Sequence, residues 1–532
     1  MTSGAGSTAI NTGTINIGSG SQGIFLKNST SLTGLSNNGG ITSTGQGSVG
    51  LFASNVSRVE NLGSGNINLL HDKSIGIYAE NTPVIDNSGT IAVGDSVDIN
   101  NPAIGIFAYN SPGTVITNNG AITSGIKSLG IYGDSTTINQ NGILNIGDTG
   151  VGIYATNSTV NLNTGSVFNM GTNGAVGVYG ISTNVINNGN LNTGSSNYGF
   201  ILKGGTFING IGTNSTTGTD SVFMYSTEAT TVNNNGNLTM TGSDNVGFYM
   251  AKDPVSGLGG GSIVNNGNIT GNVGNNNVGI YNYGGTVDNN GSISVGNSDL
   301  LFRTKADGTT ELDVQNSKYS VGIYGENSII INHTGANVAA GYGGIGIVAK
   351  GGSASNFGTV TTNGDYSMGM YTENGIIRNE TGATINVSGD NAIGMAGKGI
   401  GSQIINQGII NVTGNDAIGM YGNLGTIITN NGIINITGNG QASKEQVADM
   451  LQRMLHFPKE EMEQMASEMT SIIEIMDTVK EIDIQYDAYA DNKNVYLNDL
   501  REDIKEDSFP TEKILQNAVN DENCFVVPKV VE

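Results

Sequence analysis

The amino-acid sequence predicts a mainly β protein: a parallel β-helix (solenoid) of about 16 coils, followed by a small α-helical hairpin with an extended C-terminal tail. Three observations lead to this fold class. A phrase of Gly, a hydrophobic residue and Tyr or Phe returns, mostly at intervals of 22 to 29 residues. A second phrase, Asn-x-Gly-x-Ile/Leu, lies between its copies. Both phrases stop near Gly440, where the composition changes within a few residues.

The Gly-hydrophobe-aromatic phrase marks the repeat. A fixed period in this range is typical of stacked arrays in which each repeat contacts only its neighbours. The second phrase reads NSGTI from Asn87, NNGAI from Asn118 and NNGII from Asn430. Copies of the first phrase, a few without the aromatic residue, begin at Gly23, Gly50, Gly76, Gly105, Gly130, Gly152, Gly177, Gly199, Gly247, Gly279, Gly322, Gly346, Gly369, Gly394 and Gly419.

Alternation around the aromatic residue predicts β-strands. In the run VGIYATNSTVNL from Val151, Ile153 and Ala155 point one way, and Tyr154 and Thr156 point the other. Short alternating runs bounded by Gly and Asn are typical of strands. If Ile153 points inward, Ile153→Asp should cost several kcal/mol, because it buries an unpaired charge, whereas Thr156→Asp should be nearly neutral.

A repeat of about 25 residues supplies two or three short strands with tight corners, which is one coil of a parallel β-helix. Coils about 4.8 Å apart would make a rod about 75 Å long. Inward Ile and Val are expected to stack in columns, and Asn at the corners to form side-chain ladders. The 83 Gly and the abundant Asn suit corners with positive φ. Such a composition is also typical of disordered segments, but the regularly spaced Ile, Val and Tyr give each repeat a core.

Charge and cysteine content narrow the classes of function. The net charge is −23 without a basic patch, which argues against nucleic-acid binding through phosphate neutralisation. No apolar run reaches the roughly 18 residues typical of a membrane-spanning helix. The start, MTSGAGSTAI, lacks the layout of a signal peptide, so the chain as written is expected in the cytoplasm. The single Cys524 excludes an internal disulfide and a cysteine-based zinc cluster.

The rod is expected to carry no catalytic, metal or cofactor site. Its Asp and Glu are scattered, usually one per repeat at a turn, where such acids cap turns and solubilise the surface. His71 and His333 are its histidines. The Gly-rich stretch SGLGGGS from Ser256 lacks the Lys-Ser/Thr ending of a phosphate loop.

Residues 1–440 resemble the repetitive passenger of Gram-negative autotransporter adhesins, in which these two kinds of phrase alternate over long distances. The resemblance implies a solenoid with a surface or adhesive role. Two hallmarks of that family, a signal peptide and a C-terminal outer-membrane barrel, are missing from the sequence. If the solenoid belongs to a longer exported protein, the expected location is the cell surface.

Residues 441–532 have the composition of a different domain. Residues 1–440 carry 12 Lys/Arg and 23 Asp/Glu, whereas residues 441–532 carry 9 and 21. Ser443 and Gln446 form a capping box that begins a first helix, and Pro458 fits the first turn of a second. The hairpin is expected over 443–483, with an apolar seam that exceeds what two helices can bury, so a partner is expected. Its apolar residues are Val447, Leu451, Met454 and Leu455, then Met462, Met465, Met469, Ile472, Ile473, Met476 and Val479.

Residues 484–532 are expected to form an extended segment that wraps a partner. The stretch from Asp487 has few apolar residues and many acids, and a short helix is predicted from Thr511. The chain closes with CFVVPKVVE, a strand-like apolar tail that would gain its structure against another protein.

Residues 443–532 resemble the C subunit of the glutamyl-tRNA(Gln)/aspartyl-tRNA(Asn) amidotransferase. The similarity is most specific from Leu500 to Glu532. There an LRED acidic turn, a short helix ending in Asn-Ala, an acidic spacer and Phe followed by VPKV occur in that order. Cys524 stands where the family usually has Gly.

The resemblance implies a non-catalytic subunit that stabilises the amidase subunit of a heterotrimeric enzyme. That enzyme amidates Glu-tRNA(Gln) or Asp-tRNA(Asn). Its amidase and kinase-like, tRNA-binding subunits use glutamine and ATP, so no cofactor is expected in this chain, and tRNA is met only through the complex. The residues expected to bind the partner are Met465, Met469, Ile472, Met476, Leu500, Arg501, Glu502, Asp503, Phe525, Val527, Pro528, Lys529 and Val530.

Two functions remain open from the sequence. In the first, the chain is an amidotransferase C subunit that carries an N-terminal solenoid. In the second, it is a fragment of a surface adhesin or autotransporter passenger with an accidental C-terminal fusion. In both, residues 1–440 and 441–532 are expected to be independent parts joined by a hinge around Gly438 to Ala442.

Overall fold

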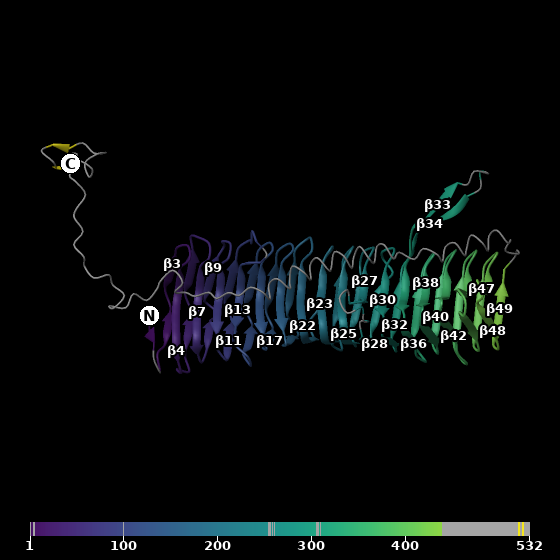
Figure 1. Cartoon of the computed structure of the whole chain (residues 1–532), viewed down its shortest axis with the longest axis horizontal. Coiled ribbons are helices and arrows are strands. Elements are labelled where there is room, and N and C mark those ends of the chain that lie inside the picture. Colours follow the sequence, from purple (N-terminus) through teal and green to yellow (C-terminus); the bar gives the residue numbers. More distant parts are fainter. Residues whose placement is uncertain are drawn as a thin grey trace. The chain divides into compact units, whose positions relative to one another are not determined.

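The computed structural model describes residues 2–3, 6–98, 100–253, 257, 259, 261–304, 308, 310–438, 520–521 and 524–525. The chain divides into two units, Met1–Val479 and Lys480–Glu532. The strands of the first unit form a parallel β-solenoid of about 17 turns (Figure 1), which confirms the predicted fold class. The predicted helical hairpin over 443–483 lies outside the described residues, and every element among the described residues is a strand.

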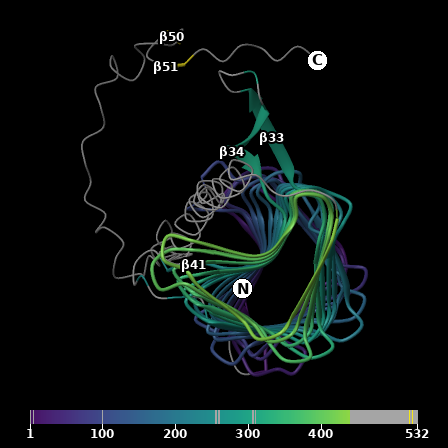
Figure 2. The same cartoon turned by 90° about the vertical axis from the view of Figure 1, so that its right-hand side faces the viewer.

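Each turn of the solenoid has three faces (Figure 2). On the first face, each strand between the two end strands pairs in parallel with the strands one turn before and one turn after, as β10 does with β7 and β13. The strands of the first face are β1 (Thr2–Ser3), β4 (Gln22–Ser29), β7 (Val49–Val56), β10 (Ile75–Glu80), β13 (Ile104–Tyr109), β16 (Leu129–Asp134), β19 (Val151–Thr156), β22 (Val176–Asn187), β23 (Tyr198–Asn209), β25 (Val222–Asn234), β27 (Val246–Met250), β30 (Val278–Tyr283), β35 (Val321–Glu326), β38 (Ile345–Lys350), β41 (Met368–Glu373), β44 (Ile393–Lys398) and β47 (Ile418–Asn423).

The second face belongs to the same 31-stranded sheet, because β22, β23 and β25 continue across the corner and pair with strands of both faces. Its other strands are β2 (Ala9–Asn11), β5 (Leu35–Asn37), β8 (Val59–Asn61), β11 (Val84–Asn87), β14 (Val115–Asn118), β17 (Thr137–Gln140), β20 (Thr159–Leu162), β28 (Gly261–Asn265), β31 (Thr286–Asn289), β36 (Ile329–Asn332), β39 (Ser353–Asn356), β42 (Ile376–Asn379), β45 (Gln403–Asn406) and β48 (Ile427–Asn430).

The third face is made of two sheets, of seven and nine strands. Between them, one turn contributes only an isolated bridge, from Asn192 to Thr216. The seven-stranded sheet holds β3 (Thr14–Ile17), β6 (Gly40–Ser43), β9 (Asn66–Leu69), β12 (Thr90–Val93), β15 (Ala121–Ser124), β18 (Ile143–Ile146) and β21 (Val167–Met170). The nine-stranded sheet holds β24 (Asn214–Thr217), β26 (Asn237–Met240), β29 (Asn268–Gly271), β32 (Ser292–Val295), β37 (Asn337–Ala340), β40 (Thr359–Asn363), β43 (Thr384–Ser388), β46 (Ile409–Thr413) and β49 (Ile433–Thr437).

The predicted inward column is confirmed. Ile131, Ile153 and Val178 are in register on β16, β19 and β22, and all three are fully buried in the core. The expectation for Thr156 is wrong, because this residue is only 3% exposed and its Oγ1 donates to Asp134 at 2.7 Å. An in-register side chain is covered by those one turn above and below, so a residue on the outer side of a strand can be buried too. Asp at position 156 would therefore place a second carboxylate beside Asp134.

The predicted Asn ladder is also present, at the end of the second-face strands. Along the ladder, an Asn donates through Nδ2 to the side-chain amide oxygen of the residue in register one turn later, as from Asn61 to Asn87 at 2.8 Å. The acceptor is Asn in every pair except the one from Asn118, which donates to Gln140. Because these amides are buried, the ladder satisfies polar groups that would otherwise be costly. It breaks at Leu162, which pairs with Gln140 and Asn187. Its members are Asn11, Asn37, Asn61, Asn87, Asn118 and Gln140, then Asn187, Asn209, Asn234, Asn265, Asn289, Asn332, Asn356, Asn379, Asn406 and Asn430.

The glycine of the repeated phrase is required by close approach between turns. A Cβ on Gly105 would lie 2.5 Å from the carbonyl oxygen of Gly130 and 2.6 Å from Cγ2 of Ile122. Because the nearer atom belongs to the backbone, a side chain can be accommodated only if the turns shift.

Gly105→Ala should therefore lower the free energy of unfolding by about 1–3 kcal/mol, through overpacking. Gly63→Ala is the matched control, since nothing lies within 4 Å of its Cβ position, and its effect should stay within about 0.5 kcal/mol. Urea denaturation followed by circular dichroism measures both. Equal midpoints for the two variants would contradict the packing explanation.

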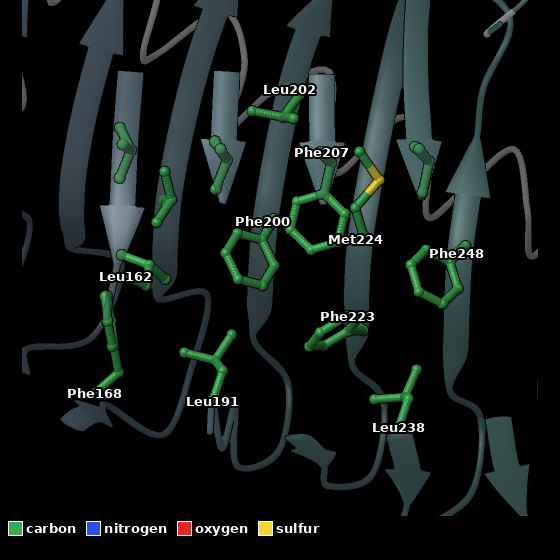
Figure 3. Packing of buried hydrophobic residues seen from close by; sticks show 14 of the residues in the cluster. Leu162, Phe168, Leu191, Phe200, Leu202, Phe207, Phe223, Met224, Leu238 and Phe248 are labelled. Atoms are coloured by element: carbon green, nitrogen blue, oxygen red, sulfur yellow. The ribbon is translucent and has the colours of Figure 1, made fainter. Parts of the chain in front are cut away.

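One repeat lacks this glycine, so it was not identified as a copy of the repeated Gly-hydrophobe-aromatic phrase. Phe223 of β25 occupies the position, in the long interval between Gly199 and Gly247. Its ring is fully buried, with ring centroids 5.4 Å from Phe200 and 5.6 Å from Phe248 (Figure 3). An aromatic cluster thus fills the core beside the turn in which the third face is interrupted.

The aromatic residues of the repeated phrase form a second stacked column, on the first-face strands. Tyr132 lies between Phe107 and Tyr154, with ring centroids at 4.9 and 5.5 Å. Burial raises the pKa of Tyr132 to about 12, with the neighbouring Asp134 adding to the effect. Burial likewise raises the pKa of Tyr225 and Tyr281 well above the ordinary value.

These shifts predict a loss of stability in alkali. An unfolded Tyr ionises near pH 10, so below that pH both states are neutral. Between about pH 10 and 12 the unfolded state releases the Tyr132 proton while the folded state holds it, and the free energy of unfolding falls. Urea midpoints at several pH values measure the slope, and Tyr132→Phe should make it shallower. The same slope in that variant would contradict the assignment.

Candidate functional site

Some acidic residues of the solenoid accept hydrogen bonds from backbone N–H groups at its turns. Asp95 accepts the backbone N–H of Ile126, and Asp148 accepts that of Thr172, each one turn later. Within the part of the chain that the structure describes, no group of three or more His, Cys, Asp or Glu side chains could hold a metal ion. Among the same residues, no helix has the length and apolar character that crossing a membrane requires.

Charged residues also alternate along one column of the first face. In the register of β35, β38, β41 and β44, Glu326, Lys350, Glu373 and Lys398 follow one another. The Lys350–Glu326 and Lys398–Glu373 pairs each have a nitrogen–oxygen distance of 4.0 Å. His333 Nε2 lies 2.9 Å from Asp288 Oδ1. The Lys and Glu side chains of the column are opposite-charge neighbours that stabilise the stacking of turns modestly.

An antiparallel hairpin, β33 (Asp299–Thr304) and β34 (Thr310–Lys318), projects from the solenoid between β32 and β35 (Figure 1). In the sequence, the hairpin lengthens one turn of the solenoid. Asn289 and Asn332, which are neighbours in the Asn ladder, are 43 residues apart. Phe302 is 43% exposed, and its ring lies 5.6 Å from that of Tyr366. Sequence reasoning missed this insertion, although the long interval could have indicated it.

Most residues predicted to bind a partner lie outside the described residues, and only Phe525 lies within them. Phe525 belongs to β51 (Cys524–Phe525), which pairs in an antiparallel manner with β50 (Asn520–Asp521). Of the predicted strand-like tail CFVVPKVVE, only Cys524 and Phe525 lie within the described residues, and the prediction stays untested for the others. The residues outside are Met465, Met469, Ile472, Met476, Leu500, Arg501, Glu502, Asp503, Val527, Pro528, Lys529 and Val530.

The C-terminal region is similar to known proteins. Residues 457–527 match the family model of the Glu-tRNAGln amidotransferase C subunit. The chain is 38% identical over 79 residues to the C subunit of the aspartyl/glutamyl-tRNA(Asn/Gln) amidotransferase of Acetivibrio thermocellus, which is 15% of this chain and 83% of that protein. The chain belongs to the amidotransferase C-subunit family.

Two further relatives in the C-subunit family support this membership. The chain is 35% identical over 79 residues to that of Caldanaerobacter subterraneus subsp. tengcongensis, which is 15% of this chain and 83% of that protein. It is 38% identical over 80 residues to that of Caldicellulosiruptor saccharolyticus, which is 15% of this chain and 84% of that protein. The family resemblance seen in Leu500 to Glu532 is thus confirmed.

The N-terminal region of this C-subunit family member matches a different family model. Residues 1–182 are similar to the BigA third pectate lyase-like domain. The match ends within β22, close to the turn in which the third face is interrupted. The match to this domain agrees with the β-solenoid that residues 1–182 form.

Proposed function

We propose that the chain acts as the non-catalytic C subunit of a heterotrimeric, ATP- and glutamine-dependent amidotransferase. The complex would convert Glu-tRNA(Gln) to Gln-tRNA(Gln), Asp-tRNA(Asn) to Asn-tRNA(Asn), or both. The observation that carries the proposal is the 38% identity to an amidotransferase C subunit over 83% of that protein's length. A match of that extent covers most of a small protein, not a shared short motif.

The proposed role is to stabilise the amidase subunit. Met465, Met469, Ile472 and Met476 would supply an apolar anchor, since their spacing places them on one face of the predicted second helix. Leu500 to Asp503 and the tail from Phe525 to Val530 would bind as extended segments. Backbone pairing of Phe525 with Asn520 supports an extended form at the start of that tail.

ATP and glutamine would be used by the kinase-like and amidase subunits, and tRNA would contact the complex through them. The solenoid would be carried as an N-terminal extension, in the same compartment as the complex. This arrangement would place the chain in the cytoplasm.

Co-expression of the full chain with the amidase and kinase-like subunits tests the proposal. The chain should co-purify with the amidase, and glutamine-dependent amidation of Glu-tRNA(Gln) or Asp-tRNA(Asn) should require it. Met469→Lys should weaken both, whereas Glu474→Lys, on the opposite face of the predicted helix, is the matched control. Failure to co-purify together with amidation that is indifferent to the chain would refute the proposal.

A second function is favoured by the match of residues 1–182 to the BigA domain. In it, the solenoid is part of a surface adhesin or autotransporter passenger, and its junction to the amidotransferase-like region is accidental. Reading genomic DNA across the codons for Gly440 and Gln441, together with fractionation of cells, separates the two functions. A continuous gene whose product fractionates with the amidase supports the first.

A further inference from the structure

The outer side of the nine-stranded sheet carries no charged side chain on its strands, all of which the structure describes. Side chains in these strands alternate between core and surface, as in β26, where Leu238 is buried and Asn237 and Thr239 point outward. The outward residues of the nine strands are all Asn, Thr, Ser, Ala or Ile. By contrast, outward positions include Asp288 on the second face and Glu326 on the first.

Hydrogen bonds between neighbouring strands hold this outer surface in a regular array. Asn237 Nδ2 donates to Asn214 Oδ1, and Asn268 Nδ2 donates to Asn237 Oδ1, each at 2.9 Å. Further along, Asn411 Nδ2 donates to Asn386 Oδ1 at 2.9 Å. Because these amides already pair within the sheet, covering the surface would leave few of their polar atoms without partners. Stacked strands with such Asn ladders can pack face to face in dry interfaces.

The charge of the whole chain favours a second copy as the partner of this surface. The net charge is −23, so two copies repel each other where their charged surfaces meet. An uncharged face allows close approach without burying an unpaired charge. Depletion of charged residues is also the compositional mark of interface cores, and one face can meet its own copy about a twofold axis.

The sheet is large enough for such a contact. It has nine strands, of four or five residues each. Their spacing and rise give a face of roughly 15 Å by 43 Å. Two such faces would bury about 1,300 Å² in total, which lies at the lower end of the range for specific interfaces.

We propose that two copies of the chain associate through the outer sides of their nine-stranded sheets. The two sheets lie about 10 Å apart, with their short outward side chains interdigitated. Thr361 of β40 is at the centre of the contact, because β40 pairs with β37, the middle strand of the sheet. The inference does not rest on the proposed function.

Sedimentation velocity of the full chain tests the dimer. The unmodified chain should form a dimer whose share rises with protein concentration, and added salt should increase that share by screening the repulsion between acidic surfaces. Thr361→Asp should raise the dimer Kd roughly a hundredfold, because it buries an unpaired carboxylate in the contact. Thr231→Asp is the matched control, since Thr231 is an exposed residue of the second face, and it should leave the Kd unchanged.

Three results would overturn the proposal. A monomer at every concentration would mean that the face does not bind a second copy. Association that salt weakens would mean that charged groups hold the copies together. Equal Kd values for Thr361→Asp and Thr231→Asp would place the contact on another face.

Thiol labelling gives a second measurement that introduces no charge. Cys524→Ser removes the single thiol, and Thr361→Cys or Thr231→Cys then places one thiol on either face. The reaction of Thr361→Cys with a maleimide should slow as the protein concentration rises through the dimer Kd, whereas that of Thr231→Cys should keep its rate. The same concentration dependence in both variants would contradict the proposed interface.

Discussion

Ile153→Asp should lower the free energy of unfolding of the solenoid by about 3–5 kcal/mol, the size expected for an uncompensated buried charge. Ile153 is fully buried in the core, between Ile131 and Val178 of the neighbouring turns. Stacked turns contact only their neighbours, so the damage falls on three turns at once. The column offers the carboxylate no cation, since its members on both sides are aliphatic.

Urea denaturation followed by β-sheet circular dichroism measures the effect. Ile143→Asp is the matched control, because Ile143 lies one strand earlier in the chain and is 39% exposed. Its loss should stay below about 1 kcal/mol. Similar midpoints for the two Asp variants would mean that the facing of β19 has been assigned incorrectly.

Ending the chain after Asn523 should weaken binding to the amidase roughly a hundredfold, or about 2.7 kcal/mol. The deletion removes β51 and with it the pairing of Phe525 with Asn520. It also removes the apolar tail residues that the proposed function assigns to the partner. Ordering such a tail is unfavourable by itself, so binding must bury its apolar side chains.

Pull-down titration of the amidase against the full and truncated chains measures this loss. Glu532→Gln, a single change at the end of the tail, should change the affinity little. Undiminished affinity after truncation would assign the binding energy to the helical hairpin alone.

The repeating features of the fold were predictable from the sequence, because each is set by a local pattern that recurs. The inward facing of Ile153 and the ladder through Asn87 follow from alternation and from a fixed phrase. The burial of Thr156 was not predictable, since it depends on Asp134 one turn away. The repeat of Phe223 was missed because a buried aromatic ring replaces the glycine that marks the other copies.

The features described for the candidate site also include some that the sequence predicts and others that it does not. Family membership was predictable from the order of the closing residues, Leu500 to Glu532, because that order is itself the signal. The hairpin β33–β34 was not predictable as an element, since its strands interrupt the period instead of following it. The exposure of Ile428 and Ile436 was not predictable either, because both residues continue the core pattern of the sequence. Only the register of β48 and β49 shows that no described turn covers them.

The Asn ladder has a consequence for how the solenoid folds. Its bonds from Asn61 through Asn118 to Gln140 join residues 22 to 31 apart. Each turn therefore closes a loop of similar length, so the entropic barrier recurs per turn and does not grow with the size of the array. The finished turn is the template for the next one, and during synthesis the N-terminal turns are complete first. A misfolded turn would then halt growth towards Thr437, while the turns before it keep their structure.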